Sequence, residues 1–165
     1  MISRLWYPQL DVFDTSRRLS ILLQYFEFSP GIERLYIVDF YLANPPLLHR
    51  TAMPADTRKL FSELKIPKPE KTFISYPSAP LLFHKMESIQ QEALNALSGK
   101  DLISLEELKH GRVELTNKGK EVFPLSNMCT SAEKKLSNFL ATKFAYNEEA
   151  GNQDLRRRTG LRRSI

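Results

Sequence analysis

The feature that most constrains the fold of this chain is a hydrophobic run, RLYIVDFYLANPP, over residues 34–46. One carboxylate, Asp39, lies within it, with apolar and aromatic neighbours on both sides. A Ser-Pro pair at residues 29–30 is typical of a helix start, and Asn44 before two prolines marks a helix end. The run therefore predicts a central helix over residues 29–43, which the rest of a globular core has to enclose.

Asp39 has two interpretations. One makes it a general base whose pKa is raised by an apolar wall; the other pairs it with a cation near a helix crossing, as is usual for buried charges. Arg34 and Arg50 are the candidate partners, although a spacing of five from Arg34 is poor for a same-face helical pair. Because no second catalytic group accompanies Asp39 in the sequence, we expect a paired structural carboxylate.

The chain before residue 147 has mostly helical periodicity. Apolar residues at steps of three and four predict further helices over residues 14–28, 54–64, 81–98, 104–110 and 130–146. Asp14 is placed to cap the first of these. Ser104 and Glu107 form a capping box for a short helix, and Thr116 caps a short turn. Together these signals predict a mainly α fold.

Residues 81–123 are arranged like a shortened winged-helix unit. A core helix is followed by a short helix, by an alternating segment RVEL (112–115) that predicts a strand, and by NKGKEVF at the position of a wing. The short helix carries glutamates, a lysine and a histidine but no arginine, which suits protein contact better than DNA reading. We therefore predict a single helical domain over residues 1–147, with a winged-helix-like unit and a short β-wing in its C-terminal half.

Positive charge is concentrated at the C-terminus. The formal net charge is +5, but residues 150–165 hold five arginines and one acid, so the remaining residues carry only +1. The arginines are Arg156, Arg157, Arg158, Arg162 and Arg163. They suit the phosphates of DNA or an acidic protein surface, and otherwise a solvated tail. We predict that residues 148–165 form a basic tail that contacts a partner or DNA, and that the body folds without residues 150–165.

No catalytic or metal-binding signature accompanies these features. The sequence lacks a glycine-rich phosphate loop, a nucleophile elbow and an HExxH motif. The residue types that bind transition metals are not closely paired. They are His49, His84, His110 and Cys129. We therefore expect a protein without catalytic residues, cofactor or metal.

The sequence also predicts a cytoplasmic protein. No apolar run approaches the ~18–20 residues of a membrane helix. The N-terminal residues lack the apolar segment of a signal peptide. A single cysteine, Cys129, cannot form an internal disulfide, which agrees with a reducing compartment.

The order of several segments resembles a bacterial family. An aromatic-proline start, Trp6-Tyr7-Pro8, precedes RLYIVDFYLANPPLL, then LLFHKMESIQQEALNAL, then GKDLISLEELKHGRVELT. This order is similar to that of the middle component of three-component ABC-ATPase systems, a group that includes Lamassu-type antiphage defence. The best marker is the string DFYLANP. Its marker residues are Asp39, Phe40, Tyr41, Asn44 and Pro45.

The resemblance implies a small accessory subunit with no catalytic residues of its own. Members of that group accompany an SMC/Rad50-like ATPase and an effector, often a nuclease, and the implied role is to bridge or regulate the two in antiphage or antiplasmid defence. Any DNA contact would run through the complex or the basic tail, and no membrane contact is expected. The alternative is a winged-helix DNA-binding transcriptional regulator anchored by its tail, and an enzyme that uses Asp39 is a remote third reading.

Overall fold

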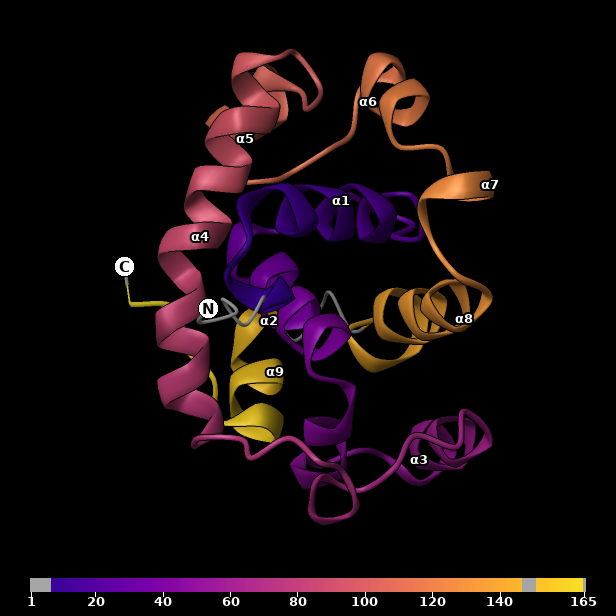
Figure 1. The fold of residues 1–165 in the computed structure, drawn as a ribbon. Helices are drawn as coiled ribbons and strands as arrows, with labels where there is room; N and C mark the ends of the chain where they lie inside the picture. Colours follow the sequence, from indigo (N-terminus) through magenta and orange to yellow (C-terminus); the bar gives the residue numbers. More distant parts are fainter. Residues whose placement is uncertain (1–6, 147–150, 165) are drawn as a thin grey trace, which may run out of the picture.

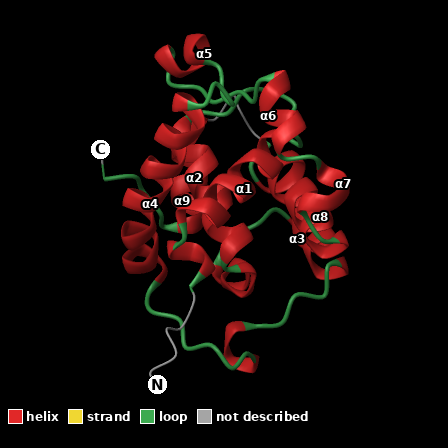
Figure 2. Cartoon of the chain, turned by 45° about the horizontal axis from the view of Figure 1, so that its top comes forward, coloured by secondary structure: helices red, strands yellow, loops and turns green. Residues whose placement is uncertain are grey.

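The computed structural model, which describes residues 7–146 and 151–164, contains the predicted central helix as α2 (Ile32–Ala43). Side chains from Glu33 to Leu42 on this helix are buried, and other helices surround it (Figure 1). The others are α1 (Val12–Leu23), α3 (Ala55–Glu63), α4 (Ala79–Gly99), α5 (Leu105–Lys109), α6 (Asn117–Val122), α7 (Leu125–Met128), α8 (Ser131–Phe139) and α9 (Gly151–Thr159). Figure 2 shows helices joined by loops across the described residues, which confirms the mainly α fold class.

The core forms where α1 and α4 pack against α2. Leu19 and Leu22 of α1 are fully buried there, together with Met86 of α4. α4 runs along one side of the molecule, from the connection after α3 at one end to α5 at the other (Figure 1). No helix among residues 7–146 and 151–164 has the length and apolarity that a bilayer span requires.

Helix α1 begins earlier than predicted, and helix α2 begins later. The cap of α1 is Asp11, whose Oδ1 accepts a 2.7 Å hydrogen bond from the Asp14 amide, so Asp14 lies in the first turn and is not the cap. α2 begins after Gly31 because the preceding segment is used elsewhere: the Pro30 carbonyl accepts the Val113 amide at 2.9 Å. The predicted end at Ala43 is confirmed.

The predicted strand over residues 112–115, and with it the β-wing, is not found in the described part of the chain. Two isolated antiparallel bridges take its place, Gly31 with Arg112 and Ile103 with Leu115. Each bridge joins this segment to a different part of the chain, so no ladder extends beyond a single pair. The segment instead ties the start of α2 to the end of α4.

The capping signals in the sequence correspond to hydrogen bonds in the structure. Ser104 Oγ accepts the Glu107 amide at 3.3 Å, but the Ser104 amide donates to the Glu114 carbonyl, so the predicted capping box of Ser104 and Glu107 is half formed. Thr116 Oγ1 accepts the Gly119 amide at 3.1 Å. α8 begins at a capping box in which Thr130 Oγ1 accepts the Glu133 amide at 3.1 Å. The helix predicted over residues 130–146 is present as α8 and a π-helical turn, η4 (Leu140–Phe144), which continues it directly.

Gly119 in α6 gives a first test of this packing. A Cβ at this position would collide with the Leu102 carbonyl oxygen and would lie 2.7 Å from Leu115 Cδ1. We expect Gly119→Ala to lower the free energy of unfolding by about 1–3 kcal/mol, since backbone cannot yield easily to an inserted methyl group. Gly99→Ala is the matched control, because nothing lies within 4 Å of its Cβ position. Chemical denaturation in which both variants unfold at the same midpoint would contradict the predicted collision.

Candidate functional site

The marker residues of the central run lie in or beside the core. Phe40 and Tyr41 are buried, with an edge-to-face contact at a centroid distance of 5.0 Å. Phe40 makes a second such contact with Phe83, at 5.7 Å. Asn44 is buried and its Nδ2 donates to the Phe40 carbonyl at 3.0 Å, while Pro45 is half-buried and begins a short 3-10 turn. The string therefore closes α2 and fills the core around it.

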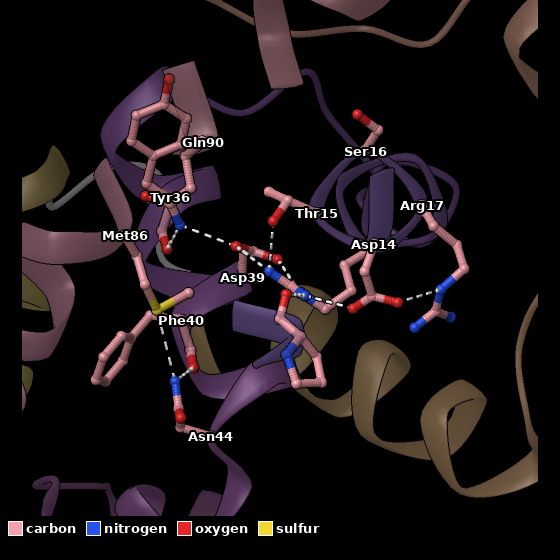
Figure 3. Close-up of polar contacts among 12 residues, drawn as sticks. Asp14, Thr15, Ser16, Arg17, Tyr36, Asp39, Phe40, Asn44, Met86 and Gln90 are labelled. Carbon is pink, nitrogen blue, oxygen red and sulfur yellow. Dashed lines mark hydrogen bonds and ion pairs between the residues drawn. The ribbon is translucent and has the colours of Figure 1, made fainter. Parts of the chain in front are cut away.

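Asp39 has no exposed surface and receives hydrogen bonds from two neighbouring helices (Figure 3). Arg18 of α1 donates through Nε to Oδ1 at 2.7 Å and through Nη2 to Oδ2 at 3.3 Å. Gln90 of α4 donates through Nε2 to Oδ2 at 2.9 Å. One carboxylate on α2 thus joins α1 and α4 at the point where the helices meet.

Arg18 is itself held from several sides. Its Nη1 donates to Asp14 Oδ2 at 2.6 Å and to the Pro8 carbonyl at 3.0 Å, and its Nη2 donates to Thr15 Oγ1 at 3.0 Å. Burial opposes the charged form, but the carboxylates of Asp39 and Asp14 outweigh it, so the pKa of Arg18 is raised. The guanidinium is therefore a fixed charge in the interior.

The expected pairing of Asp39 with a cation is present, but both predicted partners are wrong. Arg34 turns toward the C-terminal segment and donates to the carbonyls of Ala145 and, at 2.9 Å, Gly151. Arg50 lies on the surface, 3.4 Å from Glu70. The partner belongs to a different helix, so spacing within the run could not reveal it.

Arg18 and Gln90 were missed as partners, although each has a sequence signal. Arg18 lies four residues before Leu22, and Gln90 lies four residues after Met86. Both positions therefore fall on the apolar face of their helix, where a polar residue needs a buried partner.

The arginines predicted to form a basic tail belong mostly to a packed segment. α9 carries Leu155, and the chain after it carries Leu161; both leucines are buried in the common core. Arg156 forms an ion pair with the buried carboxylate of Glu33 on α2, and its Nη2 to Oε2 distance is 3.0 Å. Glu33 also accepts the Arg163 amide at 3.0 Å. Glu33, which sequence reasoning missed, therefore anchors the C-terminal segment to the central helix.

Two more of these arginines contact aromatic rings. The Arg158 guanidinium lies 4.9 Å from the centre of the Phe144 ring, and its Nη2 donates to the Phe144 carbonyl at 2.7 Å. Arg163 lies 5.4 Å from the centre of the Tyr36 ring, where burial raises the pKa of the phenol to about 12. The guanidinium groups of Arg158 and Arg163 are therefore engaged by aromatic rings of the same chain.

Arg157 and Arg162 are the arginines of the predicted set that remain exposed in the described residues. The Arg157 side chain is 80 % exposed and is paired with Asp154 at 2.9 Å. Hydrogen bonds from Arg158 and Arg157 lower the pKa of Asp154. The basic surface that residues 151–164 offer to a partner is therefore much smaller than the sequence suggests.

The short helix of the predicted winged unit, α5, carries charges of both signs. Arg112 Nε lies 2.6 Å from Glu107 Oε2, and this contact lowers the pKa of the Glu107 carboxyl. His110 lies 3.6 Å from Glu106, and Leu105 is exposed beside it. A mixed surface of this kind is compatible with protein contact and offers little attraction to phosphates.

The residues considered for metal binding lie apart. His49 Nε2 is 2.7 Å from the Ile66 carbonyl oxygen, and His84 Nδ1 is 3.1 Å from Ser164 Oγ. Cys129 is a free, half-buried cysteine, and burial raises the pKa of its thiol. No group of three or more potential ligands occurs within residues 7–146 and 151–164.

Comparison with known proteins identifies the family of this chain. Residues 4–164 match the family model described as the ABC-three component (ABC-3C) system Middle Component 5. No curated protein and no solved structure shows a significant match to the chain. The matched range includes the central helix with its marker residues, the Arg18–Asp39 pair and the C-terminal segment. The chain therefore belongs to the Middle Component 5 family of ABC-three component systems.

Proposed function

We propose that this chain is a non-catalytic accessory subunit that bridges or regulates the ATPase and the effector of an ABC-3C defence system. The observation that carries the proposal is the family match over residues 4–164, because a middle component has partner subunits. The resemblance to Lamassu-type systems supports an SMC/Rad50-like ATPase and a nuclease-type effector as those partners, acting against phage or plasmid DNA.

The arrangement of the helices supports a bridging role. α5 lies at one end of α4, and the connection between α3 and α4 lies at the other, in both views (Figures 1 and 2). Both ends carry exposed apolar residues, including Leu105 at the first and Phe73 at the second. A subunit with two separated surfaces can contact two partners at once.

Co-expression tests the proposal. We expect the chain to co-purify with the products of the neighbouring ATPase and effector genes as one complex of fixed stoichiometry, measured by size-exclusion chromatography with light scattering. The isolated chain is the control for self-association. A chain that binds neither gene product, and that instead protects one operator sequence in a footprinting assay, would contradict the proposal and support a DNA-binding regulator.

A further inference from the structure

We propose that the connection between α3 and α4 docks an apolar tip, formed by Phe73 and Ile74, into an apolar pocket rimmed by carboxylates on a partner subunit. The inference rests on the proposed function, since it assigns one surface of the chain to one of the partners. It concerns the end of the molecule opposite α5 (Figure 1).

The tip is exposed to an extent that the fold of this chain does not explain. The Phe73 side chain is wholly exposed, and its neighbour Ile74 is 60 % exposed. Single exposed apolar residues are ordinary on protein surfaces, but adjacent large ones at a loop tip mark an interaction site more often. Neither residue belongs to the buried core or to the side chains packed against it.

The base of the tip is fixed to the body. Pro69 is buried and begins a 3-10 turn, η3 (Pro69–Lys71), and its carbonyl accepts both the amide and the hydroxyl of Thr72, at 3.2 and 2.9 Å. The Thr72 hydroxyl also lies 3.2 Å from the Ile74 carbonyl oxygen. On the other side, Tyr76 packs against the core. A tip held on both sides loses less conformational entropy on docking than a free loop would.

The charges around the tip indicate the partner's chemistry. Lys65, Lys68 and Lys71 precede it and are exposed. Two acids of the same segment offset part of this charge: Glu63 is exposed, and Glu70 lies 3.4 Å from Arg50. The surplus of positive charge on the segment before the tip is complementary to carboxylates at the rim of an apolar pocket, and such complementarity favours association and fixes orientation.

A protein partner suits these observations better than nucleic acid or a membrane. The lysines are few and separated by prolines, whereas binding to phosphates gains affinity from many neutralising contacts. An aromatic residue in a fully desolvated pocket is a usual centre of binding energy between proteins. Family membership supplies such a partner, because a middle component acts beside other subunits.

Assembly of the three co-expressed components tests the inference. We expect the double variant Phe73→Ser, Ile74→Ser to weaken binding of the chain to one purified partner by about tenfold or more in isothermal titration calorimetry. Its melting temperature should equal that of the unaltered chain, because the replaced side chains lie outside the core. Lys68→Glu with Lys71→Glu should weaken the same binding, and this charge effect should diminish in high salt.

Phe13→Ser is the matched control, since Phe13 is an exposed phenylalanine of α1, away from the tip, and should leave that binding unchanged. If the unaltered chain assembles and the double variant assembles equally well, the inference is wrong and the proposed function stands. If the unaltered chain assembles with neither product, both fail. If the tip variant instead loses binding to anionic phospholipid vesicles or to duplex DNA while assembly is intact, the assignment to a protein pocket is overturned.

Discussion

Replacing Arg18 with methionine should lower the free energy of unfolding by about 3–5 kcal/mol, because the change strands a buried charge. Asp39 has no exposed surface, and without Arg18 the side-chain donor that remains to it among residues 7–146 and 151–164 is Gln90 Nε2. Methionine fills a similar volume, so lost packing contributes little. Urea denaturation followed by circular dichroism at neutral pH measures the effect.

Arg50→Met is the control for loss of an arginine. Arg50 also has a carboxylate partner, but both side chains are at least half exposed, and such pairs contribute about 1 kcal/mol or less. Removing both charges, as Arg18→Met with Asp39→Leu, should cost less than the sum of the single changes, because the stranded charge is then absent. An Arg18 variant no less stable than the Arg50 variant would show that the pair does not hold the helices together.

The same pair bears on whether Asp39 acts directly in function. Asp39→Asn retains the shape of the side chain but leaves the Arg18 guanidinium with Asp14 as its remaining carboxylate. We therefore expect Asp39→Asn to lower the melting temperature. Any loss of assembly should then result from this loss of stability. Normal melting combined with lost assembly would give Asp39 a direct role in partner binding.

Local signals in the sequence predict most of the helices, because a cap and an apolar stripe act within a few residues. Ser104 and Thr116 are examples, since each cap is satisfied three residues away. The pairing of Arg18 with Asp39 depends on how two helices cross, and no local pattern encodes that crossing. The strand predicted at residues 112–115 fails for a related reason, because its partners, Gly31 and Ile103, lie in different segments.

The C-terminal segment shows how composition can mislead. A run of arginines is typical of a solvated tail, yet one face of α9 packs against the body. Leu155 enters the core, while Arg156 meets a buried acid, Glu33, some 120 residues earlier in the chain. Two leucines among many cations predict little burial in the sequence alone, because their contact with the core depends on how the chain folds back onto α2.

The packing of Leu161 in the core gives the second large predicted effect on stability. Leu161 is fully buried, and we expect Leu161→Ala to lower the free energy of unfolding by about 2–5 kcal/mol, the usual range for a leucine removed from a core. Arg162→Ala is the matched control at the adjacent, exposed position and should change stability by about 0.5 kcal/mol or less. Both are measured by thermal unfolding of the full chain.

Deleting residues 151–165 should be more damaging than either substitution. The deletion removes Leu155 and Leu161 together and leaves the Glu33 carboxylate, which is buried, without Arg156. Removal of one partner from a buried ion pair is costly by itself, because a charge then remains in the interior. We therefore expect the shortened chain to unfold or aggregate, which reverses the expectation drawn from composition. A shortened chain that melts like the full one, while Leu161→Ala is also neutral, would mean that this segment does not stabilise the core.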